Sequence, residues 1–86
     1  MQPKEKEFAI ILGNLVRKLR RENTKNYSLY LDENLIPSST LQTLESAKSS
    51  PKLYTLMRIL GGMGISLVDF AKLLENELPK DIFTKE

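Results

Sequence analysis

The stretch IPSSTLQTLESAK, residues 36–48, decides the fold, because its pattern predicts a short helix with an unusual surface. Pro37 fits the first position of a helix, where a missing N–H costs nothing. Leu41 and Leu44 lie one turn apart on one face, and the other positions are almost all Ser, Thr and Gln. We therefore expect a helix from Pro37 to about Ser46 that buries its leucines and turns a small, polar face outward.

Apolar spacings of three and four residues predict four more helices around this stretch. The fourth helix along the chain has an apolar stripe at Leu53, Leu56, Met57 and Leu60. No segment alternates apolar and polar residues long enough to predict a strand. The expected fold is therefore all-α, a compact five-helix bundle. The expected helices cover residues 8–22, 27–33, 37–46, 51–62 and 67–77.

Capping and turn residues mark the expected helix boundaries. Asn26 and Ser66 are expected N-caps, because a side-chain oxygen at that position can accept a hydrogen bond from a free backbone N–H. Gly64 is expected to end the fourth helix in a left-handed conformation. In the turn before Pro37, Asn34 is the residue that tolerates this conformation best.

Length and composition exclude several classes of protein. A chain of 86 residues encloses one modest core, which predicts one domain at 8–78, a disordered tail at 1–7 and a loose tail at 79–86. Cysteine and histidine are absent, which removes thiol nucleophiles, imidazole bases and the usual zinc ligands. We therefore expect no enzyme activity, metal, cofactor or small-molecule ligand. No apolar run approaches the roughly 18 residues that span a bilayer, which predicts a cytoplasmic protein without a membrane partner.

Positive charge is concentrated in the first third of the chain. Residues 1–30 hold seven Lys or Arg against three Glu, although the net charge of the whole chain is only +2. Cations near the end of a helix are also stabilised by the helix dipole. The distribution is therefore compatible with an anionic partner and with a solvated helix end.

Three motifs stand in the order typical of one family. They are LGNLVRKLR at 12–20, STLQTLESAK at 39–48 and PKLYTLMRILGGMGISL at 51–67. Together with two short helices joined by a brief turn, they resemble the Cro and lambda-repressor type of helix-turn-helix, also called XRE-like. The resemblance covers residues 8–70 and implies a lambda-repressor-like bundle in which helices two and three form the helix-turn-helix. This chain has Leu35 where the family prefers a residue tolerant of left-handed backbone, so we expect the turn to pivot at Asn34 instead.

The resemblance also implies how the protein would meet double-stranded DNA. In the family the third helix enters the major groove and the second lies on the phosphate backbone. Gln42 is the strongest expected reader, because its amide can bind adenine in two places. The residues expected to contact bases are Ser38, Ser39, Gln42 and Thr43. Those expected to contact phosphates are Arg17, Arg21, Lys25, Tyr27, Lys48, Ser49 and Lys52.

The implied function is sequence-specific transcriptional regulation, as a repressor or controller of the bacterial or phage kind located at the nucleoid. Such domains usually act as homodimers on symmetric operators, because a single copy reads only a few base pairs. Ile10 and the apolar residues of the fifth helix are candidate dimer surfaces.

Two features favour an alternative hypothesis. The third helix has no Arg or Lys before Lys48, and Asp32 and Glu33 lie beside the expected groove. The alternative is an interaction module of the same fold that holds a protein partner, with weak or absent DNA binding. Taken singly, exposed Ser, Thr and Gln residues can also serve only to solubilise a helix.

Some residues are expected to support the fold rather than to bind. Glu45 is expected to make a structural hydrogen bond or salt bridge within the turn. Tyr30 and Tyr54 are expected at the edge of the core with their hydroxyls in water.

Overall fold

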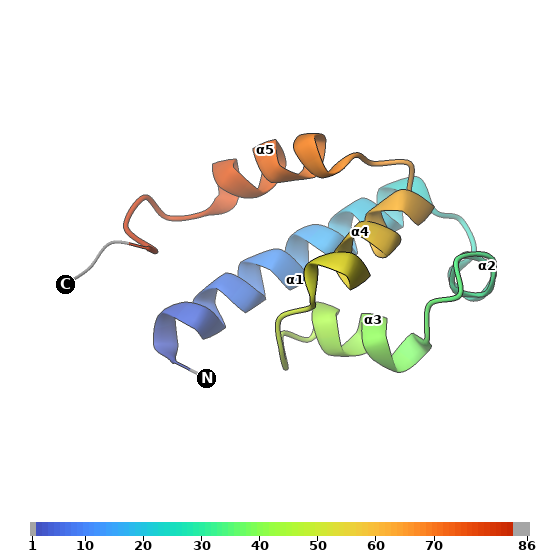
Figure 1. Cartoon of the computed structure of the whole chain (residues 1–86), viewed down its shortest axis with the longest axis horizontal. Coiled ribbons are helices and arrows are strands. Elements are labelled where there is room, and N and C mark those ends of the chain that lie inside the picture. Colours follow the sequence, from blue (N-terminus) through green and yellow to red (C-terminus); the bar gives the residue numbers. More distant parts are fainter. Residues whose placement is uncertain (1, 84–86) are drawn as a thin grey trace.

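The computed structural model describes residues 2–83, and over that range it contains five helices and no strand. The all-α prediction is therefore confirmed for the described residues. Figure 1 shows the helices wrapped around the long first one. The helices are α1 (Pro3–Asn23), α2 (Tyr27–Glu33), α3 (Ser38–Glu45), α4 (Leu53–Gly62) and α5 (Leu67–Glu77).

The first helix begins earlier than the apolar pattern indicates. We expected a disordered tail at 1–7, but α1 begins at Pro3, so residues 3–7 are helical; residue 1 lies outside the described range. Proline is favoured in the first turn, and the Lys and Glu residues that follow are good helix formers. The apolar periodicity starts only where α1 reaches the core, which is why it marked the boundary too late.

The core lies where α3 and α5 pack on α1 and α4 packs on α5. In Figure 1, α3 and α5 lie on opposite sides of α1. The largest side chains that are fully buried come from four of the helices, and they are Val16, Leu41, Ile59, Leu60 and Phe70. A Cβ atom built on Gly13 would lie 2.5 Å from the carbonyl oxygen of Leu44. The absence of a side chain at Gly13 therefore lets α3 sit directly on α1.

Three helices end in the same way, with one residue in a left-handed conformation. These residues are Leu35 (φ 53°), Ala47 (φ 60°) and Gly64 (φ 72°). The prediction for Gly64 is confirmed, whereas the expected pivot at Asn34 is wrong, because Asn34 has φ −105°. After α2, the amide of Ile36 donates to the carbonyl of Leu31 at 2.9 Å, and both side chains are buried. This hydrogen bond and the apolar contact that accompanies such an ending hold Leu35 left-handed.

The two expected N-caps are confirmed. Asn26 accepts a hydrogen bond from the amide of Leu29 at 2.9 Å, and Ser66 accepts one from the amide of Asp69 at 3.1 Å. The prolines are displaced from their expected positions. Pro37 is the N-cap of α3 rather than its first residue, and α4 begins two residues after Pro51.

The expected apolar stripes of α4 and α5 are only partly buried. On α4, Leu56 and Leu60 are buried as expected, but Leu53 and Met57 are exposed and Ile59 takes their place in the core. The buried face is therefore rotated relative to the prediction. On α5, Phe70 is fully buried and Leu74 is partly buried, whereas Leu67 and Leu73 are exposed.

The segment after α5 packs against the bundle instead of hanging loose. Ile82 is buried, and the ring of Phe83 lies 6.0 Å from that of Phe8. Lys4 donates to the backbone carbonyl of Asp81 at 3.3 Å. The expected loose tail at 79–86 is therefore wrong at Ile82, and residues 84–86 lie outside the described range.

The described helices differ in length and in apolar content. Between residues 2 and 83, no single helix is long and apolar enough to cross a membrane. Only α4 and α5 taken together have the length and composition, and they are bent by 105° relative to each other.

Candidate nucleic-acid interface

Helix α3 separates its apolar and polar residues onto opposite sides. Leu41 and Leu44 are almost completely buried, as their spacing predicted. Ser38, Ser39 and Gln42 are exposed, and Thr43 is half-buried. The four residues expected to contact bases therefore belong to the solvent-facing part of α3, which is held from behind by its two leucines.

A groove of about 420 Å³ runs between α3 and the segment that leads into α4. Ser39 and Thr43 line one wall, and Ser49, Lys52 and Thr55 line the other. The structure thus brings two of the residues expected to contact bases beside two of those expected to contact phosphates. Polar hydroxyls and one exposed amine give the groove the donors that a phosphate or a base edge requires.

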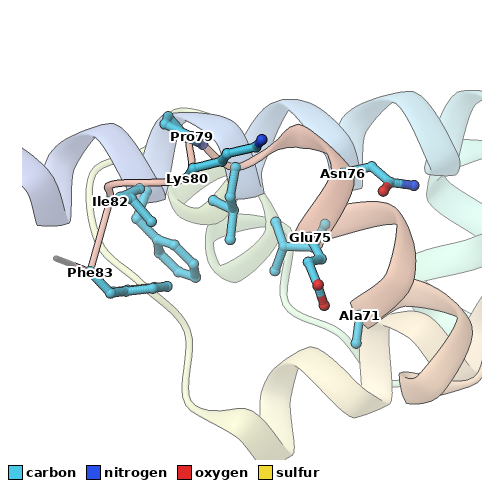
Figure 2. Close-up of a pocket in the computed structure, with 10 residues that line it drawn as sticks. Ala71, Glu75, Asn76, Pro79, Lys80, Ile82 and Phe83 are labelled. Carbon is cyan, nitrogen blue, oxygen red and sulfur yellow. The ribbon is translucent and has the colours of Figure 1, made fainter.

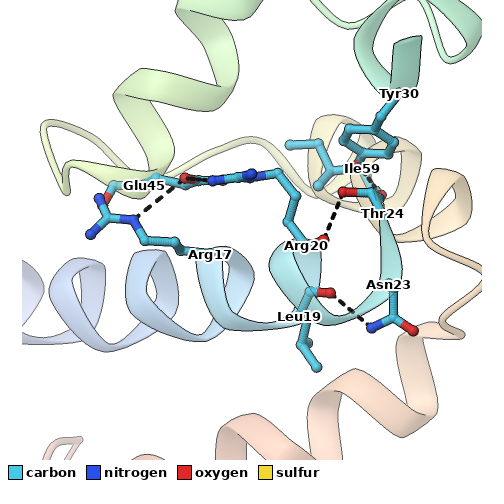
Figure 3. A network of polar contacts seen from close by, with 8 residues as sticks. All are labelled: Arg17, Leu19, Arg20, Asn23, Thr24, Tyr30, Glu45 and Ile59. Atoms are coloured by element: carbon cyan, nitrogen blue, oxygen red, sulfur yellow. Dashed lines mark hydrogen bonds and ion pairs between the residues drawn. The ribbon is translucent and has the colours of Figure 1, made fainter. Parts of the chain in front are cut away.

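Helix α1 holds the far end of α3 through a charged network (Figure 3). Arg20 makes two hydrogen bonds to the Glu45 carboxylate, from Nε to Oε2 at 2.6 Å and from Nη2 to Oε1 at 2.9 Å. Arg17 donates to the Glu45 backbone carbonyl at 3.0 Å and lies 3.5 Å from the carboxylate. Glu45 thus has the structural role expected of it, although its partners belong to α1 rather than to the turn.

Arg20 also supports the start of α2. Its guanidinium lies 4.8 Å from the centre of the Tyr27 ring. The hydrogen bond to Glu45 raises the pKa of Arg20 above its ordinary value, against the opposing effect of burial. One permanently charged side chain therefore links the N-terminal turn of α2 to the end of α3, and Tyr27 is half-buried against it.

The remaining cations of the expected phosphate set are exposed. Arg21 is in the last turn of α1, Lys25 precedes α2, and Lys48 follows α3. The backbone amide of Lys48 closes the end of α3 by donating to Thr43 at 3.1 Å. Arg17 differs from these three, because part of its hydrogen-bonding capacity is already used by Glu45.

Arg58 was missed by the sequence analysis. Its guanidinium donates to the carbonyls of Asn34 at 2.7 Å and Leu35 at 3.0 Å, so it clamps the turn between α2 and α3 from α4. The role of a lone arginine on α4 could not be predicted from the sequence, because the carbonyls that it binds come close to it only in the fold.

Tyr30 makes a second link between α2 and α4, because its hydroxyl donates to the Ile59 carbonyl at 2.6 Å. Tyr30 is buried and Tyr54 is largely exposed, so both expectations of a core-edge tyrosine were wrong.

One hollow in the described chain lies away from α3. It has a volume of about 770 Å³ and is formed by the N-terminal part of α1, the end of α5 and the segment after it. Figure 2 shows Pro79, Lys80, Ile82 and Phe83 around it. Its walls are mainly apolar, and they bring together no nucleophile with a base. Among residues 2–83, no three carboxylates are grouped to hold a metal ion.

Comparisons with protein-family models, with curated proteins and with solved structures found no match.

Proposed function

We propose that this protein is a sequence-specific DNA-binding regulator, a repressor or controller of the Cro and lambda-repressor type that works as a homodimer at the nucleoid in the cytoplasm. In this proposal α2 and α3 form the helix-turn-helix, and α3 enters the major groove. One observation carries the proposal: α3 presents a face of small polar side chains that shares a groove with Ser49 and Lys52. Small side chains allow close approach to base edges, and the neighbouring cation suits a phosphate.

Rigid support of α3 strengthens this proposal. The Arg20–Glu45 pair fixes the C-terminal end of α3, Gly13 lets that same end sit directly on α1, and Arg58 clamps the turn before α3. A reading helix has to hold its side chains in a fixed register, and these contacts hold α3 at both of its ends.

Affinity in this proposal comes mainly from phosphates. No Arg or Lys precedes Lys48 on α3, so the strongest partner of guanine is absent there. Gln42 is exposed and is the residue best suited to adenine. Arg21, Lys25, Lys48 and Lys52 are exposed cations that can release counterions from the duplex.

A second candidate is supported by a specific observation. Asp32 and Glu33 are exposed at the end of α2, close to apolar residues that are also exposed. An acidic and apolar surface of this kind fits a protein partner better than a polyanion. The alternative function is therefore a protein interaction module of the same fold with weak DNA binding.

Selection from a random duplex library distinguishes the two functions. The regulator predicts enrichment of a two-fold symmetric motif, with adenines at the positions nearest Gln42. Gln42→Ala should reduce the preference for the selected motif over other duplexes by about tenfold, while the affinity for generic duplex changes little. Lys52→Ala is the matched control, because losing a phosphate contact should weaken all duplexes alike. Enrichment of no motif would favour the interaction module, whereas equal losses for Gln42→Ala on all sequences would remove its role as the reader of bases.

A further inference from the structure

Exposed apolar residues gather where α4 meets the turn between α2 and α3. Leu35 is 75% exposed, and on α4 Leu53, Tyr54 and Met57 are 60%, 73% and 47% exposed. Arg58 joins the two parts, because it donates to the Leu35 carbonyl at 3.0 Å and lies 5.9 Å from the centre of the Tyr54 ring. We call these five residues the turn–α4 patch.

The backbone of the patch is strained at Leu35, whose side chain is exposed. Leu35 is left-handed, with φ 53°, a conformation that costs roughly 1–2 kcal/mol for any residue with a Cβ. Glycine or asparagine ordinarily fills such a position. Here a leucine fills it and projects into solvent, so its side chain contributes little to the core of the single chain.

The position of the patch relates it to α3. A small hollow of about 100 Å³ is lined by Leu35, Arg58, Thr40 and Thr55. Thr40 and Thr55 also line the groove that holds Ser39 and Lys52. The patch therefore borders the candidate nucleic-acid interface along the α4 side, where a partner would leave the polar face of α3 open.

We propose that two copies of this chain pair through the turn–α4 patch. The two-fold geometry of this pairing rests on the proposed function. A two-fold axis that passes through this patch and points toward the duplex brings both α3 helices to one side of the dimer, as a symmetric operator requires. The pairing is isologous, so each copy offers the same patch.

Charge and area both fit a second copy. Asp32 and Glu33 are exposed a few residues before Leu35 and make no ion pair with another described residue, whereas Arg58 is the cation of the patch. A surface with both signs can be complementary to itself. Four exposed apolar side chains make a smaller surface than the roughly 800 Å² per partner of a standard interface, which includes a polar rim. This size fits a reversible dimer.

Sedimentation equilibrium of the full chain tests the pairing. The wild-type chain should form a dimer with a Kd in the micromolar range. Tyr54→Ser should raise that Kd at least tenfold. Val68→Ser should leave the Kd unchanged; Val68 is 64% exposed and belongs to the α5 surface, which is another candidate for pairing from the sequence. Leu35→Gly should also raise the Kd at least tenfold, yet keep or raise the melting temperature, because the left-handed strain is relieved. A wild-type chain that stays monomeric to millimolar concentration, or a dimer broken by Val68→Ser and not by Tyr54→Ser, would overturn the assignment.

Duplex titration separates this proposal from the proposed function. Tyr54→Ser should keep its affinity for a duplex with one half-site and lose the cooperative binding to two half-sites. Dimers that depend on Tyr54 but bind no duplex would remove the DNA function and leave the pairing surface standing. Cooperative binding that survives Tyr54→Ser would remove the pairing surface and leave the DNA function standing.

Discussion

Replacing Glu45 by alanine should destabilise the fold by about 2 kcal/mol. The carboxylate accepts two short hydrogen bonds from Arg20, and the two side chains are only 9% and 14% exposed. Hydrogen bonds to charged groups contribute about 1.5–3 kcal/mol each when buried, and the remaining water access at Arg20 reduces this, which gives the estimate of about 2 kcal/mol. For a chain of 86 residues this corresponds to a fall in melting temperature of roughly 10 °C.

Urea unfolding of the four proteins of a double-mutant cycle measures the coupling free energy between Arg20 and Glu45. Glu45→Ala, Arg20→Ala and the double variant should show a coupling free energy of about 1.5 kcal/mol. The hydrogen bond from Arg17 to the Glu45 backbone carbonyl survives in Glu45→Ala, so the cycle isolates the side-chain contacts. Glu33→Ala is the matched control, because that exposed acid has no partner among the described residues and its loss should change stability by less than about 0.5 kcal/mol. Equal effects of Glu45→Ala and Glu33→Ala would refute the idea that this network fixes α3.

Further predictions concern packing, pH and the helix ends. Gly13→Ala should destabilise the fold by about 1–3 kcal/mol, because its Cβ would lie 2.5 Å from the Leu44 carbonyl oxygen. Gly61→Ala, with open space around it, should stabilise the fold by about 0.5–1 kcal/mol. Thermal unfolding measures both variants, and similar shifts in melting temperature would contradict the close approach of α1 and α3. Burial raises the pKa of Tyr30 to about 12, so the unfolded chain, with its tyrosine near 10, loses this proton first. Stability should therefore fall as pH rises from 10 toward 12, and Tyr30→Phe should flatten that slope in urea unfolding; an unchanged slope would place the titration elsewhere. Ala47→Gly should stabilise by about 0.5–1 kcal/mol through relief of its left-handed conformation, and a loss of stability would show that the strain at φ 60° is negligible.

The helices could be predicted because their signals are local. The spacing of Leu41 and Leu44 and the caps Asn26 and Ser66 each act within one or two turns of chain. The start of α1 was missed, since residues 3–7 are helical without touching much of the core. Periodicity reports where a helix is buried, not where it begins.

The candidate site was predictable only in part. The polar face of α3 follows from the positions of its leucines, so the exposure of Ser38, Ser39 and Gln42 could be expected. The clamp from Arg58 and the exposure of Leu53 and Met57 depend on how α4 rotates against the turn, which short-range patterns do not determine. Leu35 shows the same limit, because tertiary contacts of Leu31 and Ile36 override the preference of a leucine against left-handed backbone.

Binding of duplex DNA at a series of salt concentrations tests the central claim most directly. The wild-type chain should bind generic duplex at micromolar concentration or tighter in low salt and lose affinity steeply as salt rises. Replacing Arg21, Lys25 and Lys52 together by alanine should abolish most of this binding and lower the slope of log affinity against log salt by about 3. Replacing Lys6, Lys72 and Lys80 lowers the net charge by the same three units on other parts of the bundle, and it should leave the slope nearly unchanged. Equal losses in both triple variants, or no salt-dependent binding by the wild-type chain, would contradict the placement of the duplex on α3.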